Sequence, residues 1–257
     1  SKVKAMLDDS KAHSKVVLIT GAGKRVGAAI AQHCHQLGMR VAIHYRESAQ
    51  QASSLCTNFN LQRPDSAITL GTDLRDTDHL QDLITQVPRK WGQLDVLINN
   101  ASSFYPMPVA KVTPSVWEDV MASNLKAPFF LAQLAAPYLK EQKGCIINLV
   151  DIQAQRPLKN YSVYCIAKAG LVMLTKSLAK ELGPNIRVNA IAPGIVLWPD
   201  DDTEFNDALR EKIAARNALK RIGTPQDIAK TAAFLINHAD FITGQIIAVD
   251  GGRSLGY

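Results

Sequence analysis

Short apolar, β-branched runs alternate with helix-length stretches along almost the whole chain. The runs lie at 16–20, 41–45, 67–70, 96–99, 145–150, 186–191 and 246–249. The stretches between them carry apolar residues three and four positions apart, as helices that cover a sheet do. Strands that alternate with helices are typical of a parallel sheet covered on both faces. We therefore predict an α/β fold with a doubly wound sheet of about seven parallel strands.

The composition supports one globular domain. The chain has 257 residues, of which 47% are hydrophobic and 20% charged, and this excludes a fibrous or wholly disordered protein. No linker rich in Gly, Ser or Pro divides the sequence, so we predict a single domain over 15–257. Residues 1–14 mix lysines and aspartates without an apolar core, and we predict a flexible segment that is not a signal peptide. No run approaches the roughly 18 apolar residues that span a bilayer, so no membrane partner is expected.

Charge and cysteines narrow the class of partner. A net charge of +6 makes an acidic ligand worth testing, such as nucleic acid or a phosphorylated molecule. The basic residues are spread along the chain, which argues against nucleic acid. The four cysteines (Cys34, Cys56, Cys145 and Cys165) have no metal-ligand spacing. We expect free thiols in a reducing cytoplasm and no metal site.

A glycine-rich turn follows the first predicted strand and opens a helix. Its sequence over 20–27 is TGAGKRVG. Gly21 and Gly27 let backbone amides approach a pyrophosphate, and the helix N-terminus adds about half a positive charge. A phosphorylated ligand would give the adjacent cations of Lys24 and Arg25 a partner. The alternative is a tight strand-to-helix turn without a ligand.

The end of the second predicted strand indicates which nucleotide is bound. Tyr45 is followed by Arg46, Glu47 and Ser48. An NAD site usually presents a carboxylate to the ribose 2′-hydroxyl, whereas a cation and a hydroxyl suit a 2′-phosphate. Arg46 and Ser48 therefore predict NADP(H), with Glu47 turned towards solvent. The alternative for Arg46 is a solvated cation at a helix start.

Two further strand ends carry residues suited to a nucleotide. Asp73 and Leu74 follow the third run, where the carboxylate of Asp73 either accepts a hydrogen bond from adenine or caps the next helix. Asn100 and Ala101 end the fourth run, where small side chains allow a ligand to approach the backbone closely.

A tyrosine and a lysine are placed to perform acid chemistry. Tyr164 and Lys168 lie four residues apart in the predicted helix 161–182, so their side chains share one face. A nearby ammonium lowers the pKa of a tyrosine from its usual value of about 10 and makes it a usable acid. Tyr161 has Cys165 four residues further on, so only Tyr164 satisfies this pairing. The alternative is a solvated pair on a helix surface.

Together these motifs resemble the short-chain dehydrogenase/reductase family. The glycine turn, Asn-Asn-Ala at 99–101, Tyr164 with Lys168, and Pro193-Gly194 appear in the family's order over about 15–252. The resemblance implies a Rossmann-type sheet, a nicotinamide cofactor and a homotetramer. It also implies that Asn124 is catalytic, holding a water near the lysine, and that Lys168 binds the nicotinamide ribose. The residues expected to bind NADPH are Gly21, Lys24, Arg25, Val26, Gly27, Tyr45, Arg46, Ser48, Asp73, Leu74, Asn100, Ala101, Ser102, Tyr164, Lys168, Pro193 and Gly194.

Two departures from the family pattern narrow the substrate. Arg25 stands where the family usually has glycine, and Asp151 stands where it usually has serine. An ionised Asp151 would repel the alkoxide that forms when a ketone is reduced. An aspartate suits a ring nitrogen that gains a proton as the neighbouring carbon accepts hydride. The alternative for Asp151 is a strand-end aspartate bonded to backbone amides.

Both departures, together with the segment NNASSFYP at 99–106, resemble the pteridine reductases. This narrower resemblance implies that Phe104 stacks on the pterin, that Asp151 protonates one ring nitrogen, and that Tyr164 is the acid for another reduction step. It also implies that the segment 195–223 covers the substrate. The expected substrate-binding residues are Arg25, Ser102, Phe104, Asp151, Tyr164 and Trp198. Arg253, near the C-terminus, is expected at a subunit boundary.

We therefore predict an NADPH-dependent reductase that acts on ring C=N bonds of pterins, of the dihydrobiopterin or dihydromonapterin type, and extends to dihydrofolate. Two alternatives stay open. One is a carbonyl reductase in which burial keeps Asp151 protonated, so that it donates as a serine would. The other is an NADP-binding regulator that uses the fold as a scaffold.

Overall fold

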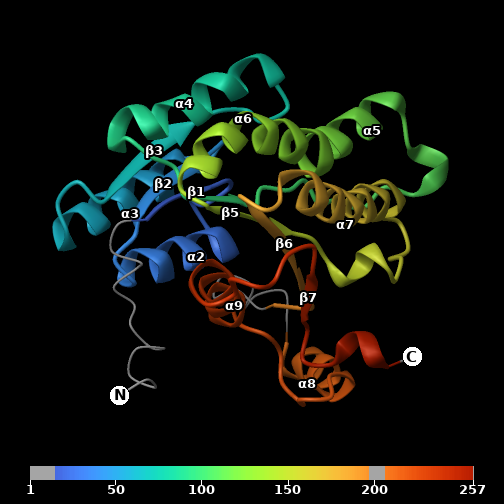
Figure 1. Cartoon of the computed structure of the whole chain (residues 1–257). Helices are drawn as coiled ribbons and strands as arrows, with labels where there is room; N and C mark the ends of the chain where they lie inside the picture. The colour runs from blue at the N-terminus through green and yellow to red at the C-terminus, as the bar shows by residue number, and fades with distance from the viewer. Residues whose placement is uncertain (1–14, 197–205, 257) are drawn as a thin grey trace.

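The parallel sheet holds the centre of the molecule (Figure 1). The computed structural model describes residues 15–196 and 206–256. The strands are β1 (Val16–Ile19), β2 (Arg40–Tyr45), β3 (Ala67–Gly71), β4 (Val96–Asn99), β5 (Cys145–Leu149), β6 (Arg187–Pro193) and β7 (Ile246–Val249). They pair in the order β3-β2-β1-β4-β5-β6-β7, always in parallel. Each predicted run matches its strand to within two residues, and the predicted fold class is confirmed.

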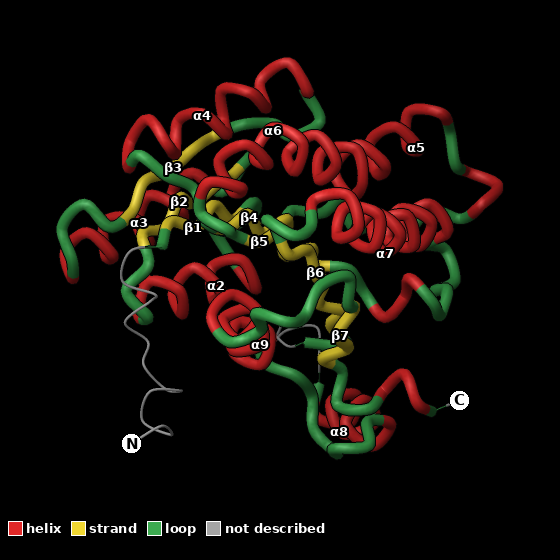
Figure 2. The backbone as a smooth tube through the Cα atoms, in the orientation of Figure 1, coloured by secondary structure: helices red, strands yellow, loops and turns green. Residues whose placement is uncertain are grey.

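Helices cover both faces of the sheet, as Figure 2 shows around the yellow strands. One face packs against α2 (Arg25–Gln36), α3 (Ala49–Gln62) and α9 (Pro225–Asn237). The other packs against α4 (Leu80–Trp91), α6 (Ala127–Glu141) and α7 (Ser162–Leu182). The remaining helices are α5 (Pro114–Met121) and α8 (Asp207–Arg216), and the short turns are η2 (Thr77–His79), η3 (Val109–Lys111), η4 (Ala122–Lys126), η5 (Ile152–Ala154) and η7 (Arg253–Leu255).

Alternation along the strands explains why the chain needs two helical layers. Val16 and Leu18 of β1 point into the core on the α4, α6 and α7 side. Val17 and Ile19 point into the core on the opposite side. Because a strand places successive side chains on opposite faces, an apolar strand buries both faces only when each is covered.

Threonine-proline pairs begin two of the helices. The hydroxyl of Thr113 accepts a hydrogen bond from the amide of Val116 at the start of α5. Thr224 forms a reciprocal capping box with Asp227 at the start of α9. In each case proline occupies the first helical turn, where its missing N–H leaves no bond unmade.

The strand order reverses at β1, and this reversal opens space for a ligand. β1 pairs with β2 on one side and with β4 on the other, so the connections that follow these strands run in opposite directions. In open parallel sheets, ligands bind at such a switch point beyond the carboxyl ends of the strands. The candidate residues that follow β1, β2, β3, β4, β5 and β6 therefore share one edge of the sheet.

Helix α7 has the length and apolar composition of a membrane span, but it is half buried inside the protein. Its buried residues include Leu171, Leu174 and Leu178, which belong to the core beside the sheet. We interpret α7 as the core helix of this fold.

Candidate active site

Tyr164 and Asp151 are in direct contact. The hydroxyl of Tyr164, in the first turn of α7, donates a hydrogen bond of 2.7 Å to Oδ2 of Asp151. Asp151 lies just beyond the end of β5, and its Oδ1 accepts a bond of 2.9 Å from the amide of Gln153 at the start of η5. The structural alternative for Asp151 is thus half correct: one oxygen is bound to backbone and the other faces the tyrosine.

Lys168 lies one turn further along α7 and is almost fully buried. Its Nζ donates a hydrogen bond of 2.8 Å to the carbonyl of Leu149 at the end of β5. The same nitrogen lies 5.7 Å from the centre of the Tyr164 ring. Tyr164, Lys168 and Asp151 therefore form one cluster, joined by the end of β5 and the first two turns of α7.

The electrostatics of this cluster differ from those expected from the spacing. The ammonium of Lys168 was predicted to lower the pKa of Tyr164. In the structure, burial and the carboxylate of Asp151 raise the pKa of Tyr164 well above its usual value. Burial lowers the pKa of Lys168 to about 8, although Asp151 acts in the opposite direction. Tyr164 is therefore a protonated donor at neutral pH, held by an acceptor.

Asn124 lies in the π-helical turn η4 between α5 and α6. Its Nδ2 donates to the carbonyls of Val120 and Ser103, at 2.9 and 3.0 Å. Its Oδ1 is buried and has no hydrogen-bond partner among the described residues. A π-helical turn often marks a functional site, and an unsatisfied buried oxygen can accept a bond from an ordered water. This arrangement fits the water-holding role that the resemblance implies.

Residues 101–108, named here the substrate loop, carry Ser102 and Phe104 between β4 and η3. Ser102 is exposed, and the side chain of Phe104 is 53% exposed. The Phe104 ring stacks on Tyr161, with ring centres 4.5 Å apart and planes 16° from parallel. It meets the ring of Tyr164 edge-on at 4.8 Å. An exposed aromatic ring is thus held beside the candidate acid, as expected of a surface on which a flat heterocycle stacks.

The glycine turn is fastened to the end of β4. The hydroxyl of Thr20 accepts bonds from the amides of Asn100 and Ala101, at 2.9 and 3.0 Å. The side-chain amide of Asn100 donates back to the carbonyls of Thr20 and Gly21. A Cβ on Gly27 would lie 2.3 Å from the oxygen of Gly21, so only glycine fits there. The two sequence motifs are therefore parts of one structure.

His44 of β2 holds the same glycine turn and was not among the predicted site residues. Its Nδ1 accepts a bond of 3.0 Å from the amide of Gly21, and its Nε2 donates to the carbonyl of Thr72 at 2.8 Å. These roles require the neutral ring, and burial lowers the pKa of His44 accordingly. Its place near the end of the buried strand β2 was the available signal.

Arg25 occupies a strained backbone position at the mouth of the glycine turn. Its φ of +55° lies in the left-handed region that favours glycine. Lys24 and Arg25 are both exposed, and Val26 packs partly against the core. Strain kept at a loop position usually accompanies a role for the side chain. A Cβ on Gly23 would lie 2.4 Å from the hydroxyl of Ser48, which shows how closely Ser48 approaches the turn.

Arg46 and Glu47 form an exposed ion pair after β2, with 2.8 Å between Nη2 of Arg46 and Oε1 of Glu47. The side chain of Glu47 is 81% exposed, as expected, but it engages the cation assigned to the 2′-phosphate. The preceding Tyr45 lies across Gly71 of β3, since a Cβ there would meet its hydroxyl at 2.7 Å.

The carboxylate of Asp73 does not cap the next helical turn, so that alternative is wrong, while the predicted contact with adenine stays a prediction. Its carboxylate is engaged by Arg75 through several hydrogen bonds, the shortest being 2.7 Å from Nη2. Asp76, rather than Asp73, caps the turn η2. Arg75 holds the pKa of Asp73 down at about 2, so the carboxylate is ionised and occupied. The side chain of Leu74 is buried in the core, which leaves only its backbone to meet a cofactor.

The segment expected to cover the substrate is joined at its ends. Val196 and Gly223 form a parallel bridge, and the amide of Gly223 donates to the carbonyl of Ile195. Pro193 and Gly194 precede it at the end of β6, where Gly194 donates to the carbonyl of Val249. Trp198 and part of the segment, 197–205, lie outside the described residues, as do residues 1–14. The Nη1 atom of Arg253, in η7, is buried with no hydrogen-bond partner among the described residues.

These residues fit the nicotinamide dinucleotide that the fold implies. The glycines allow backbone amides to approach a pyrophosphate. The helical hydrogen bonds of α2 begin with the bond from the amide of Ala28 to the carbonyl of Lys24, and the amides ahead of it are those that a helix N-terminus offers to an anion. Cations stand at the turn and after β2, where phosphates would lie. The neutral His44 and the threonine hydroxyl hold the turn in place without a ligand.

Comparison with known proteins gives matches over nearly the whole chain. Residues 21–254 match a family model described as enoyl-(acyl carrier protein) reductase. The chain is 37% identical to pteridine reductase 1 of Leishmania tarentolae over 93% of this chain and 96% of that protein. It is 35% identical to a 3-oxoacyl-(acyl-carrier-protein) reductase of Staphylococcus aureus (93% and 98%), and 33% identical to a 7alpha-hydroxysteroid dehydrogenase of Bacteroides fragilis (94% and 95%). All three relatives are named as oxidoreductases.

Proposed function

The chain belongs to the short-chain dehydrogenase/reductase family, and from this premise we propose that it is an NADPH-dependent pteridine reductase. Members of this family are oxidoreductases that use a nicotinamide cofactor. The observation that carries the proposal is the bond between Tyr164 and Asp151, with Lys168 beside it. The similarity to pteridine reductase 1 supports it, and so does the exposed ring of Phe104 next to that pair.

The glycine turn, Lys24, Arg25, Arg46 and Ser48 would hold the phosphates of the cofactor, and Lys168 its nicotinamide ribose. When bound, NADPH supplies a hydride to a ring carbon of the substrate. The adjacent nitrogen then needs a proton, so that the C=N bond becomes CH–NH. The hydroxyl of Tyr164 carries the proton that this nitrogen would receive, either directly or relayed through the carboxylate of Asp151, since the two groups share a hydrogen bond at the carboxyl end of β5.

The residues divide the work between positioning and proton transfer. Phe104, supported by Tyr161, offers a flat face for the pterin. Burial and Asp151 raise the pKa of Tyr164, so it keeps its proton before the reaction, and it would act as an acid once a substrate nitrogen replaces Asp151 as the acceptor. The side chain of Asp151 is held in place because its second oxygen accepts a hydrogen bond from the amide of Gln153 at the start of η5. Asn124, with an unsatisfied oxygen in η4, would hold a water through which the lost proton is replaced.

A carbonyl reductase is the second candidate. The 35% identical relative is named as a 3-oxoacyl reductase, a class that acts on a carbonyl group. The same Tyr164 and Lys168 would serve a ketone, provided that Asp151 carried a proton. An ionised carboxylate beside a developing alkoxide would instead oppose the reaction.

The proposal extends to assembly and place of action. We expect a homotetramer in the cytoplasm, with no nucleic acid or membrane partner. Phe129 on α6, and Ile166 and Met173 on α7, are 42%, 48% and 61% exposed, and exposed apolar surface of this kind is typical of subunit contacts. The mass of the protein in solution, measured by light scattering, tests the oligomer.

The deciding experiment measures NADPH oxidation with dihydrobiopterin, dihydrofolate and a simple aromatic ketone in parallel, and repeats each assay with NADH. We expect turnover of the two pterins with NADPH. Turnover of the ketone alone would select the carbonyl reductase. Binding of NADPH without turnover of any of the three would favour a regulator.

A further inference from the structure

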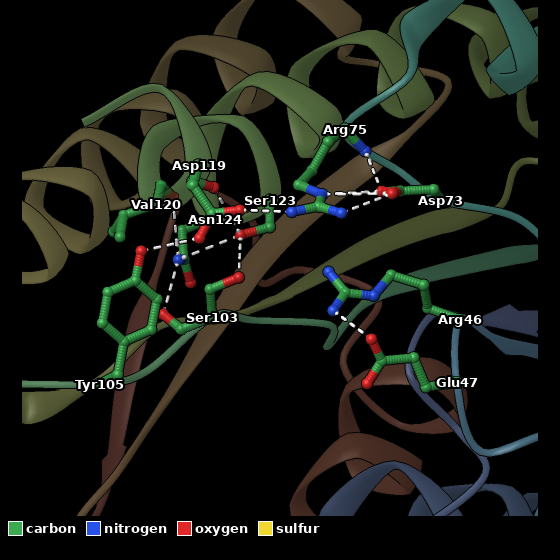
Figure 3. A network of polar contacts seen from close by, with 10 residues as sticks. All are labelled: Arg46, Glu47, Asp73, Arg75, Ser103, Tyr105, Asp119, Val120, Ser123 and Asn124. Carbon is green, nitrogen blue, oxygen red and sulfur yellow. Dashed lines mark hydrogen bonds and ion pairs between the residues drawn. The ribbon is translucent and has the colours of Figure 1, made fainter. Parts of the chain in front are cut away.

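A chain of polar contacts runs from the end of β3 to the substrate loop (Figure 3). Arg75 lies between two carboxylates: Nη2 is 2.7 Å from Oδ2 of Asp73, and Nη1 is 2.6 Å from Oδ1 of Asp119. The other oxygen of Asp119 accepts a bond of 2.7 Å from the hydroxyl of Tyr105. The guanidinium thus links the end of β3 to α5, and Asp119 extends this link to Tyr105.

The guanidinium of Arg75 is fixed in its plane. Its Nε donates to Asp73 at 3.0 Å, in addition to the bond from Nη2, while Nη1 reaches across to α5. Arginine presents these donors in a rigid fork, which lysine cannot do. Arg75 therefore sets the position of Asp119 relative to the end of β3.

Tyr105 is the last residue in this series of polar contacts, and it lies in the substrate loop. Partial burial and then the carboxylate of Asp119 raise the pKa of Tyr105 to about 12, so its hydroxyl stays a donor. Tyr105 directly follows Phe104, the ring that stands beside Tyr164. A shift of the Tyr105 hydroxyl would therefore move the adjoining aromatic ring.

The loop depends on such contacts because residues 101–108 form neither helix nor strand. Ser103 ties its first part to η4, through a bond of 2.8 Å from the hydroxyl of Ser123 and the bond from Asn124. Figure 3 shows both contacts beside Tyr105. Further along, the amide of Met107 donates to the carbonyl of Asn160. Between these points, Tyr105 is the side chain that anchors the loop to α5.

We propose that Arg75 is a positioning residue for substrate recognition. It holds Asp119, Asp119 holds Tyr105, and Tyr105 fixes the loop so that the Phe104 ring faces the space beside Tyr164. The inference rests on the proposed function only for the nature of the substrate. The side chains of Arg75 and Asp119 are 39% and 26% exposed, and ion pairs so exposed contribute little to global stability. The consequence of losing them is expected in loop order.

Hydrogen–deuterium exchange of the full chain without ligand tests the linkage. We compare Tyr105→Phe, which removes one hydroxyl, with Arg75→Met, which removes the fork. The control is Lys90→Met, since Lys90, near the end of α4, forms an exposed ion pair with Asp65, which precedes β3, whereas Arg75 and Asp73 follow β3. We expect faster exchange in peptides covering 101–112 for the first two variants, with the control unchanged. A double variant should exchange no faster than either single variant, because both substitutions interrupt the same series of contacts between Arg75, Asp119 and Tyr105.

Kinetics with dihydrobiopterin adds the functional readout. We expect KM for the pterin to rise about tenfold in both variants, as the loss of one charge-assisted bond implies, with a smaller change in kcat. Tyr105→Phe leaves the bonds of Asp73 to Arg75 in place, so its affinity for NADPH, measured by nucleotide fluorescence, should change less than that of Arg75→Met.

The two proposals fail in different ways. Faster exchange without any pterin turnover would reject the proposed function and retain Arg75 as a positioning residue for the loop. Unchanged exchange in both Tyr105→Phe and Arg75→Met would overturn the positioning role, whatever the substrate. A KM for dihydrobiopterin equal to that of the wild type in both variants would also overturn it.

Discussion

Tyr164 donates its proton towards Asp151 across 2.7 Å, and this contact makes the carboxylate part of the acid group. Its electrostatic effect is opposite to that of a neighbouring lysine, because an anion favours the neutral tyrosine. Under the proposed function, Tyr164 keeps its proton until a substrate atom takes the place of the carboxylate.

Tyr164→Phe removes the hydroxyl and keeps the ring. We expect kcat to fall by about a hundredfold to ten-thousandfold, the usual contribution of a positioned acid. Affinity for NADPH should change little, since the ring remains. Steady-state kinetics and a fluorescence titration measure the two effects. Tyr161→Phe is the matched control because it keeps the stack on Phe104, and normal activity in Tyr164→Phe would remove the tyrosine from the mechanism.

Asp151→Ser restores the residue usual in the family. Pterin reduction should be lost, and ketone reduction should appear or increase, because a hydroxyl can donate to a carbonyl oxygen without repelling an alkoxide. The pKa of Tyr164 should fall towards its ordinary value, since Asp151 contributes to raising it. Parallel assays with dihydrobiopterin and an aromatic ketone measure the change. Pterin kinetics identical to those of the wild type would contradict the role of Asp151.

The pH dependence of the reaction should reflect Lys168. Burial lowers its pKa from 10.5 to about 8, so the ammonium is present below this pH and lost above it. We expect kcat/KM to decline as pH rises through about 8. Because Asp151 raises the pKa of Lys168, residual activity in Asp151→Ser should decline at a lower pH. Stability responds with the opposite sign, since the unfolded chain binds more protons between about 8 and 10.5 and this group then makes stability rise with pH.

Arg46→Ala and Glu47→Gln should change cofactor preference in opposite directions. Loss of Arg46 removes a charge-assisted bond to the 2′-phosphate and should weaken NADPH binding about tenfold to a hundredfold, with little effect on NADH. Loss of the Glu47 charge frees Arg46 from its ion pair and should strengthen NADPH binding. Dissociation constants for both nucleotides measure the result. An equal loss for both in Arg46→Ala would place recognition of the phosphate elsewhere.

Arg25→Gly should raise the stability of the protein and weaken its binding of NADPH. Glycine relieves the left-handed backbone at φ +55°, a gain of about 1 kcal/mol in the free energy of unfolding. The same change removes a cation from the mouth of the glycine turn and should weaken NADPH binding. Denaturant unfolding and nucleotide titration give the two quantities. A variant that loses stability while binding NADPH normally would show that Arg25 serves the fold.

The fold was predictable because its signals are local. Seven apolar runs and the glycines after β1 each act within a few residues, and the structure confirms the strands and the strand-to-helix turn that they predict. The spacing of Tyr164 and Lys168 correctly brought them together. The pKa of the tyrosine could not follow from that spacing, because burial and the carboxylate of Asp151 depend on how β5 ends against α7.

The ion pair of Asp73 with Arg75 could not be predicted, for a different reason. Arg75 is two residues away from Asp73, but the reason that the guanidinium stays in place lies at Asp119, 44 positions along the chain. No periodicity or spacing joins residues at that distance. The same holds for His44 of β2, whose two hydrogen bonds depend on the pairing of β2 with β1 and β3, because Gly21 follows β1 and Thr72 follows β3.

The bridge between Val196 and Gly223 also bears on how such enzymes diverge. Because the two ends of the segment meet at one bridge, the residues between them can change in number while both ends keep their positions beside the sheet. The entropic penalty of altering the length is small, about 0.6 kcal/mol for each doubling of the loop. Under the proposed function, changes in this segment would alter the contacts to the substrate, while the strands and the cluster of Tyr164, Lys168 and Asp151 keep their positions.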